Sequence, residues 1–218
     1  MKKLRVINRV LGPIATNTYL VYHNDTKACV IVDPADNAES IESTVSDNGL
    51  KPEAILLTHG HCDHFMAADE IRKFYHIPVM CLDAEKKTLL DAGLNGSENI
   101  LGVSAVLTPD RLLKDGEELS LAGVLWRVIF TPGHTEGGCC YYVKDEGILF
   151  SGDTLFRESY GRCDMEGGDE RKIAVSIMQR LMTLPDETIC FPGHMESTTI
   201  GHEKQYNPLV IYERSLNR

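Results

Sequence analysis

No apolar stretch of this sequence approaches the ~20 residues that a membrane-spanning helix needs. The opening residues, MKKLRVINRV, include basic side chains but lack the long apolar core and the small-residue cleavage site of a signal peptide. We therefore expect a protein that has no membrane partner and that works in the cytoplasm.

Basic residues are also scarce, because 22 lysines and arginines stand against 32 aspartates and glutamates, for a formal net charge of −10. This balance argues against nucleic acid as a partner, since a negatively charged polymer is repelled by an acidic protein. The seven cysteines are odd in number and show no regular spacing, which indicates reduced thiols rather than a disulfide framework. The expected partner is a small-molecule substrate, and the chain is expected to be a monomer or a homodimer.

The sequence also has no low-complexity linker, so the 218 residues are expected to form a single domain over 1–218. Short β-type segments bounded by Gly, Pro, Asn or Asp come in two batches, with helical patterns after each batch. The expected strands are 4–10, 17–23, 28–34, 53–57, 77–82, 117–123, 124–130, 139–145, 147–153 and 187–194, and the expected helices are 37–49, 63–75, 83–91 and 169–182. This order predicts an α+β fold in which two sheets pack together with helices outside.

Polar side chains follow four of the predicted strands at the point where each strand ends. His59 follows EAILLT, His134 follows VIFTPG, Asp153 follows ILFSG and His194 follows ETICFPG. Binding groups tend to lie on loops that a rigid scaffold positions, and glycine or proline beside each group permits the tight turn that such a loop needs. We therefore expect these four side chains to belong to one site.

The segment ILLTHGHCDH at 55–64 adds three further candidates within a few residues of His59. Imidazole and carboxylate groups without thiolate suit zinc, iron, manganese or cobalt. The candidate ligands are His59, His61, Asp63, His64, His134, Asp153 and His194. They suffice for two ions that share one carboxylate, whereas a lone ion would leave a buried acid–base cluster in need of other partners. A single histidine in a Pro-Gly turn is more often a hydrogen-bonding residue, so the metal prediction depends on the cluster.

Four motifs, THGHCDH, TPGHTEGG, FSGDTLF and FPGH, resemble in this order the metal-binding signatures of the metallo-β-lactamase superfamily across residues 58–194. The segments 17–21, 151–169 and 197–208 are similar to the short bacterial members of its glyoxalase II-like, or hydroxyacylglutathione hydrolase-like, branch. The resemblance implies a four-layer αββα sandwich of two mixed sheets, with the site at one edge between them.

The resemblance also implies how the ligands divide between two divalent ions, for which zinc is expected and iron or manganese are alternatives. The first ion would take His59, His61 and His134; the second would take Asp63, His64 and His194, with Asp153 bridging both. Two such ions ~3.5–4 Å apart lower the pKa of a bridging water toward neutrality and create a hydroxide that attacks a carbonyl. Asp63 and Asp153, acting with this hydroxide, are the expected catalytic residues.

The leading functional prediction is a dinuclear metallo-hydrolase that cleaves a small acyl thioester of the hydroxyacylglutathione type. A persulfide dioxygenase with one iron on the His59-side ligands is the alternative, and a lactonase-type hydrolase is a third possibility. A non-catalytic metal protein would typically have lost at least one ligand. Lactam hydrolysis receives less weight, because a periplasmic lactamase would need an export signal.

The substrate side of the site departs from the long glyoxalase II members, which append a helical domain whose basic residues contact glutathione. Only ~24 residues follow His194 here, so no such domain is expected, and whether glutathione is used stays open. Arg162, in YGRCD, matches the position of a basic residue near the substrate in the family. Arg157 and Tyr160 are the other substrate-binding candidates.

Overall fold

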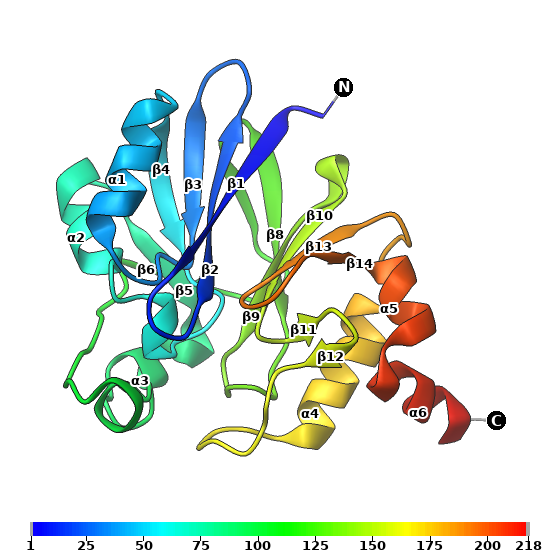
Figure 1. Cartoon of the computed structure of the whole chain (residues 1–218). Helices are drawn as coiled ribbons and strands as arrows, with labels where there is room; N and C mark the ends of the chain where they lie inside the picture. Colours follow the sequence, from blue (N-terminus) through cyan, green and yellow to red (C-terminus); the bar gives the residue numbers. More distant parts are fainter. Residues whose placement is uncertain (1, 217–218) are drawn as a thin grey trace.

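Two six-stranded sheets face each other in the computed structural model, which describes residues 2–216, and helices lie on both outer sides (Figure 1). The first sheet has the order β1-β2-β3-β4-β5-β6 and the second β14-β13-β10-β9-β8-β7. Helices α1 and α2 lie outside the first sheet, and α4, α5 and α6 outside the second (Figure 1). The predicted αββα sandwich is therefore confirmed.

The first sheet contains β1 (Leu4–Leu11), β2 (Thr16–His23), β3 (Ala28–Val32), β4 (Lys51–Leu56), β5 (Val79–Leu82) and β6 (Arg111–Leu113). The second contains β7 (Glu118–Leu121), β8 (Val124–Phe130), β9 (Cys139–Val143), β10 (Ile148–Gly152), β13 (Ile189–Pro192) and β14 (Thr198–Thr199), while β11 (Leu155–Phe156) and β12 (Ser159–Tyr160) form a separate hairpin. The α-helices are α1 (Ala38–Asp47), α2 (Ala68–Tyr75), α3 (Lys86–Leu89), α4 (Glu170–Val175), α5 (Ile200–Tyr206) and α6 (Pro208–Leu216).

Strand alternation divides the apolar side chains among three layers of core. On β9, Cys139 and Tyr141 face the space between the sheets, whereas Cys140 and Tyr142 face the helices outside the second sheet. This is the expected pleat, in which successive side chains point to opposite faces. Because β3, β5, β9 and β10 are buried on both faces, they appear in the sequence as nearly continuous apolar runs.

Three predicted helices differ from the structure. Residues 63–75 do not form one helix, since a 3₁₀ turn at Cys62–His64 is followed by irregular residues before α2 begins at Ala68. Predicted helix 83–91 is a 3₁₀ turn at Asp83–Glu85 followed by α3, and predicted helix 169–182 is α4 continued by a π-helical turn at Ser176–Leu181.

No helix among residues 2–216 has the length and apolar character needed to cross a membrane.

Strand direction brings the predicted site together. In the first sheet β3 and β4 are parallel, so their carboxyl ends lie at the same edge. In the second sheet β10 is parallel to β13 and antiparallel to β9, which is in turn antiparallel to β8. Consequently β8, β10 and β13 share one direction, and the residues that follow all of these strands meet at one edge of the sandwich.

Candidate metal centre

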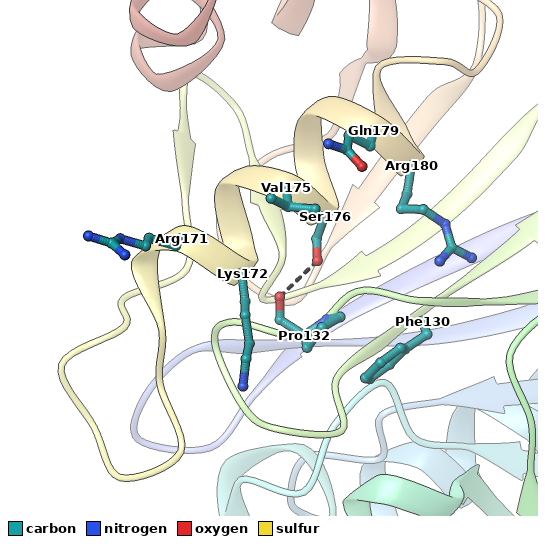
Figure 2. A pocket seen from close by; sticks show the side chains of 8 residues that line it. All are labelled: Phe130, Pro132, Arg171, Lys172, Val175, Ser176, Gln179 and Arg180. Carbon is teal, nitrogen blue, oxygen red and sulfur yellow. Dashed lines mark hydrogen bonds between the residues drawn. The ribbon is translucent and has the colours of Figure 1, made fainter.

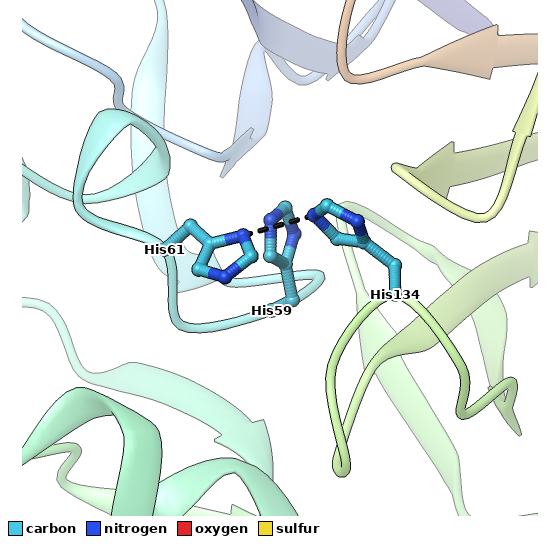
Figure 3. Close-up of side chains that lie close together, drawn as sticks. All are labelled: His59, His61 and His134. Atoms are coloured by element: carbon cyan, nitrogen blue, oxygen red, sulfur yellow. Dashed lines mark hydrogen bonds between the residues drawn. The ribbon is translucent and has the colours of Figure 1, made fainter. Parts of the chain in front are cut away.

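The seven predicted ligands converge at this edge in three overlapping groups. Within each group, one nitrogen or oxygen of every residue lies within 4.8 Å of those of the other two. The groups are His59 with His61 and His134, His59 with His64 and Asp153, and Asp63 with His64 and His194. Figure 3 shows the first group, in which His59 and His61 come from the loop after β4 and His134 from the loop after β8.

Hydrogen bonds to Nδ1 fix three of the imidazole rings. His134 Nδ1 lies 2.7 Å from the carbonyl of Arg162, which can only accept, so this nitrogen donates. The Nδ1 atom of His64 lies 3.0 Å from Oδ2 of Asp33 and also donates. In each of these two rings the neutral imidazole then carries its lone pair on Nε2, which is the atom available to a metal ion.

The third ring, His59, is fixed through a hydroxyl. The Thr58 hydroxyl donates to Asp33 Oδ2 at 2.7 Å, so it can accept from His59 Nδ1 at 3.1 Å. The Asp33 carboxylate also accepts the Thr58 N–H at 2.8 Å. One buried carboxylate at the end of β3 therefore orients both His64 and, through Thr58, His59.

The inward atoms of the cluster fit a metal ion. Three of them are buried and make no hydrogen bond among residues 2–216: His59 Nε2, His64 Nε2 and Asp153 Oδ1. His61 faces His134 through its Nδ1, which lies 2.9 Å from His134 Nε2 (Figure 3). Buried polar atoms are seldom left without a partner, and unpaired ones call for an explanation such as an ion. Imidazole nitrogens and a carboxylate oxygen that share one small space are the donor set of a divalent transition-metal site.

Burial and neighbouring charges shift the pKa values of the histidines in this cluster in opposite directions. Burial, with the neighbouring histidines, lowers the pKa of His59 well below its ordinary value, and burial with His134 lowers that of His61 to about 3. Burial also lowers the pKa of His64, but the carboxylates around it outweigh burial and raise the value to about 9. Neutral imidazoles are the forms that bind metal, and a proton on His64 competes with an ion for Nε2.

The carboxylates shift in the opposite sense. Burial alone would raise the pKa of Asp63 and of Asp153, yet His64 and His194 beside them lower both values, that of Asp153 to about 2. Both groups are therefore ionised at neutral pH and can ligate. The Thr16 hydroxyl donates to Asp63 Oδ2 at 2.6 Å, which fixes this carboxylate from β2.

The three substrate-binding candidates lie on the segment after Asp153, but none contacts the ligands through its side chain. Arg162 touches His134 only through its carbonyl, while its exposed guanidinium pairs with Asp164 at 2.6 Å. Arg157 pairs with Glu196 at 3.0 Å. Tyr160 packs against the apolar core beside α4 and α6. Their role in substrate binding stays a prediction.

Sequence reasoning missed two buried carboxylates that organise the site, Asp33 and Glu85. Asp33 follows β3 directly, just as Asp153 follows β10, so the strand-end pattern could have found it. Glu85 gives no comparable signal, since it lies in a turn that resembles an ordinary acidic helix start.

A hollow of about 320 Å³ lies between Pro132 and the helical segment that begins with α4 (Figure 2). Lys172, Ser176 and Arg180 line it from α4 and the π-helical turn, and the Ser176 hydroxyl donates to the Pro132 carbonyl at 2.8 Å. The lining contains none of the seven candidate ligands. The hydrogen bond from Ser176 ties the turn that carries His134 to the helical segment after α4.

Comparisons with known proteins agree with this geometry. Residues 11–194 match the sequence profile of the family described as Metallo-beta-lactamase superfamily. The chain is 39% identical over 201 residues to "Probable metallo-hydrolase YqgX" of Bacillus subtilis, covering 92% of this chain and 94% of that protein. It is 32% identical over 190 residues to "Hydroxyacylglutathione hydrolase GloC" of Haemophilus influenzae, covering 86% and 89%.

Solved structures extend the comparison. The BLEG-1 B3 metallo-beta-lactamase superposes with a TM-score of 0.90 at 41% identity, covering 94% of this chain and 99% of that one. TTHA1623, solved in a di-iron-bound form, superposes with a TM-score of 0.83 at 35% identity, covering 93% and 99%. The similarity thus extends over nearly the full length of each of these proteins.

Proposed function

This chain belongs to the metallo-β-lactamase superfamily, as its motifs predicted, and on that premise we propose that it is a dinuclear hydrolase of small acyl thioesters. The coarser description, a metallo-hydrolase with a His/Asp metal-binding group, follows from the family match and the cluster. The thioester substrate and the presence of two ions are the proposed steps beyond it.

The position of Asp153 is the observation that carries the dinuclear proposal. Its Oδ2 lies 3.5 Å from Nε2 of His134, which belongs to the first ligand set. Its Oδ1 lies 3.5 Å from Nε2 of His64, and its Oδ2 lies 3.4 Å from Nε2 of His194, both in the second set. A single carboxylate that reaches histidines of both sets is placed to serve two ions at once. We assign His59, His61 and His134 to one ion and Asp63, His64 and His194 to the other.

When bound, divalent ions supply Lewis acidity that activates water and polarises a carbonyl near neutral pH. His59, His64 and His134 hold their Nε2 atoms in place through the Nδ1 hydrogen bonds described above. The Thr16 hydroxyl donates to the Asp63 carboxylate and fixes its position, and we assign to Asp63 the orientation of the attacking water. Asp153 holds the two ligand sets together. No serine or cysteine nucleophile is needed.

Similarity to the hydroxyacylglutathione hydrolase of Haemophilus influenzae supports the thioester substrate. Relatedness to a di-iron-bound structure makes iron an alternative to zinc. We propose that Arg162 and Arg157, both exposed on the segment that wraps the metal centre, contact the carboxylates of the substrate's thiol carrier, beside Tyr160. Guanidinium groups suit such carboxylates because they can donate two parallel hydrogen bonds.

A panel of substrates tests the proposal: S-lactoylglutathione, acyl esters of other small thiols, an acyl homoserine lactone and nitrocefin. We expect thioester hydrolysis with the highest kcat/KM, lost on chelation and restored by zinc or iron. The Arg162→Ala variant should raise KM about tenfold with little change in kcat, since an interaction equal in ground and transition states affects KM alone. No thioester turnover by fully loaded protein would contradict the proposal.

Lactam hydrolysis is a second candidate, favoured by one specific observation. The structure named as a B3 metallo-beta-lactamase is 41% identical to this chain. Nitrocefin in the same panel decides between the two activities, because turnover of nitrocefin above that of every thioester would reverse their order.

A further inference from the structure

Glu85 is a buried carboxylate that contacts both loops of the first ligand set. It is 1% exposed and lies at the end of the 3₁₀ turn that follows β5. Its Oε1 accepts the Gly60 N–H at 2.8 Å, and Gly60 stands between His59 and His61 in the sequence. Its Oε2 accepts the Thr135 hydroxyl at 3.0 Å, and Thr135 directly follows His134.

The two loops come from different sheets, since one follows β4 in the first sheet and the other follows β8 in the second. The N–H of Gly137, in the second loop, also donates to Glu85. A Cβ on Gly137 would lie 2.2 Å from the backbone nitrogen of Glu85, and a Cβ on Gly60 would lie 3.1 Å from its Oε1. Glycine in each loop therefore lets the backbone close in on the same carboxylate.

We propose that Glu85 is a positioning residue that sets the separation between the loop of His59 and His61 and the loop of His134, and thereby sets metal affinity at this ligand set. The inference rests on the proposed assignment of these three histidines to one ion, and it holds whichever substrate is cleaved. Glu85 does not touch the ligands themselves.

The carboxylate suits this role because both of its oxygens accept and neither donates. Glutamine keeps the length of the side chain but replaces one acceptor oxygen with an NH₂ group. The Thr135 hydroxyl can accept from that group, whereas the N–H groups of Gly60 and Gly137 can only donate, so an NH₂ group that faces either of them removes a backbone anchor. Substitution of a residue that orients metal ligands in this way typically lowers metal affinity roughly 10–100-fold.

Glu146 provides a matched control. It is also buried, at 4% exposure, and it accepts two backbone N–H groups, those of Lys3 at 3.0 Å and Leu4 at 3.2 Å. It lies before β10, whose opposite end leads to Asp153, so it is remote from the metal centre. Glu146→Gln therefore repeats the chemical change and its cost in stability without touching the ligand loops.

The experiment titrates metal-free wild-type, Glu85→Gln and Glu146→Gln proteins with Co²⁺ and follows visible absorption, with zinc affinity measured by competition against a chelator. We expect Glu85→Gln to lower the affinity for one of the two ions by roughly 10–100-fold and to change the cobalt spectrum. Glu146→Gln should leave the metal affinity and the cobalt spectrum unchanged. Thr135→Val removes one hydrogen bond only, so it should lower the affinity for the same ion by a smaller factor. This variant tests the proposal even if Glu85→Gln does not fold.

Unchanged cobalt affinity and spectrum in folded Glu85→Gln and Thr135→Val proteins would overturn the inference, as would an equal loss in Glu146→Gln. Failure of the proposed function shows separately. A wild-type titration that ends at one ion, or loaded wild-type protein without turnover, contradicts the dinuclear thioesterase while the effect of Glu85 on that ion is still measured.

Discussion

At the residue scale, imidazole orientation is the feature that separates this cluster from a chance gathering of histidines. His59, His64 and His134 each engage Nδ1 in a hydrogen bond, which leaves Nε2 for the centre. Asp33 supplies the acceptor for the first two, directly or through Thr58. The site therefore depends on a carboxylate that we do not place among its ligands.

Asp33→Asn tests this dependence. The substitution preserves size, and asparagine tolerates the left-handed backbone at this position, where φ is 49°. One acceptor oxygen becomes a donor, so Thr58 or His64 loses its partner. We expect zinc affinity to fall roughly 10–100-fold, measured by chelator competition. Asp25→Asn, on the exposed turn between β2 and β3, is the control, and equal affinities in the two variants would contradict the role of Asp33.

The cysteines give a second prediction at this scale. Six are buried, and Cys163 is partly exposed, with burial raising its pKa to about 11. Because the thiolate reacts and the thiol does not, alkylation of Cys163 should be slow near neutral pH and should accelerate about tenfold per pH unit below that pKa. Mass spectrometry of native protein should show one slow label and six more after denaturation. Rapid labelling at neutral pH would contradict the structure.

The sequence predicted all seven converging side chains, because each ligand follows a strand or stands in one dense motif. It did not reveal Glu85, whose role depends on two loops from different sheets meeting in space. Sequence spacing carries no information about such a contact. Likewise it could not show that the Arg162 guanidinium pairs with Asp164 and that its carbonyl contacts His134.

At the element scale, tight turns after the strands bring the ligands together. A Cβ on Gly193 would lie 2.1 Å from Asp153 Oδ1 and 2.7 Å from His64 Cε1. The Gly193 N–H also donates to the Gly152 carbonyl at 2.9 Å, which ties the turn after β13 to the turn after β10. No side chain fits between these two turns.

Gly193→Ala should therefore displace the turn that carries His194 and reduce metal content from two ions to one per chain, as measured by elemental mass spectrometry. Gly49→Ala is the control. It has φ of +60° but no atom within 4 Å of an added Cβ, so it carries backbone strain alone, of about 1 kcal/mol. Two ions retained in Gly193→Ala would show that the turn has room to adjust.

Strands were predicted more accurately than helices, for a physical reason. Strands such as β3, β9 and β10 are apolar runs bounded by turn residues, and burial on both faces makes each run continuous. The short strands β6, β12 and β14 contain no such run and were not predicted. The helical spacing across 63–75 was misleading, because Asp63 and His64 lie in a 3₁₀ turn whose conformation serves the metal centre rather than a helix. Helical periodicity therefore marked α2 correctly but extended it into the ligand segment.

At the scale of the whole molecule, two sheets contribute ligands to one centre, so metal binding and folding are coupled. An ion that binds only the folded chain stabilises it by about 2.7 kcal/mol at a free concentration of 100 times Kd. For a domain of this size, 1 kcal/mol shifts Tm by roughly 2–4 °C. Chelation should therefore lower Tm by roughly 5–10 °C for each ion lost.

Trp126, the only tryptophan, is fully buried between the sheets and reports this unfolding by fluorescence. The comparison variant is Glu85→Gln. Its Tm should fall less on chelation than the Tm of the wild type. Identical melting curves with and without chelator would contradict the coupling between the metal centre and the fold.

Metal content per chain, measured by elemental mass spectrometry together with S-lactoylglutathione hydrolysis on the same preparation, tests the central claim most directly. A dinuclear thioesterase should contain close to two ions per chain, and its turnover should rise with occupancy of the second ion. One iron per chain, no hydrolysis and oxygen-dependent consumption of a glutathione persulfide would contradict it and establish the dioxygenase instead.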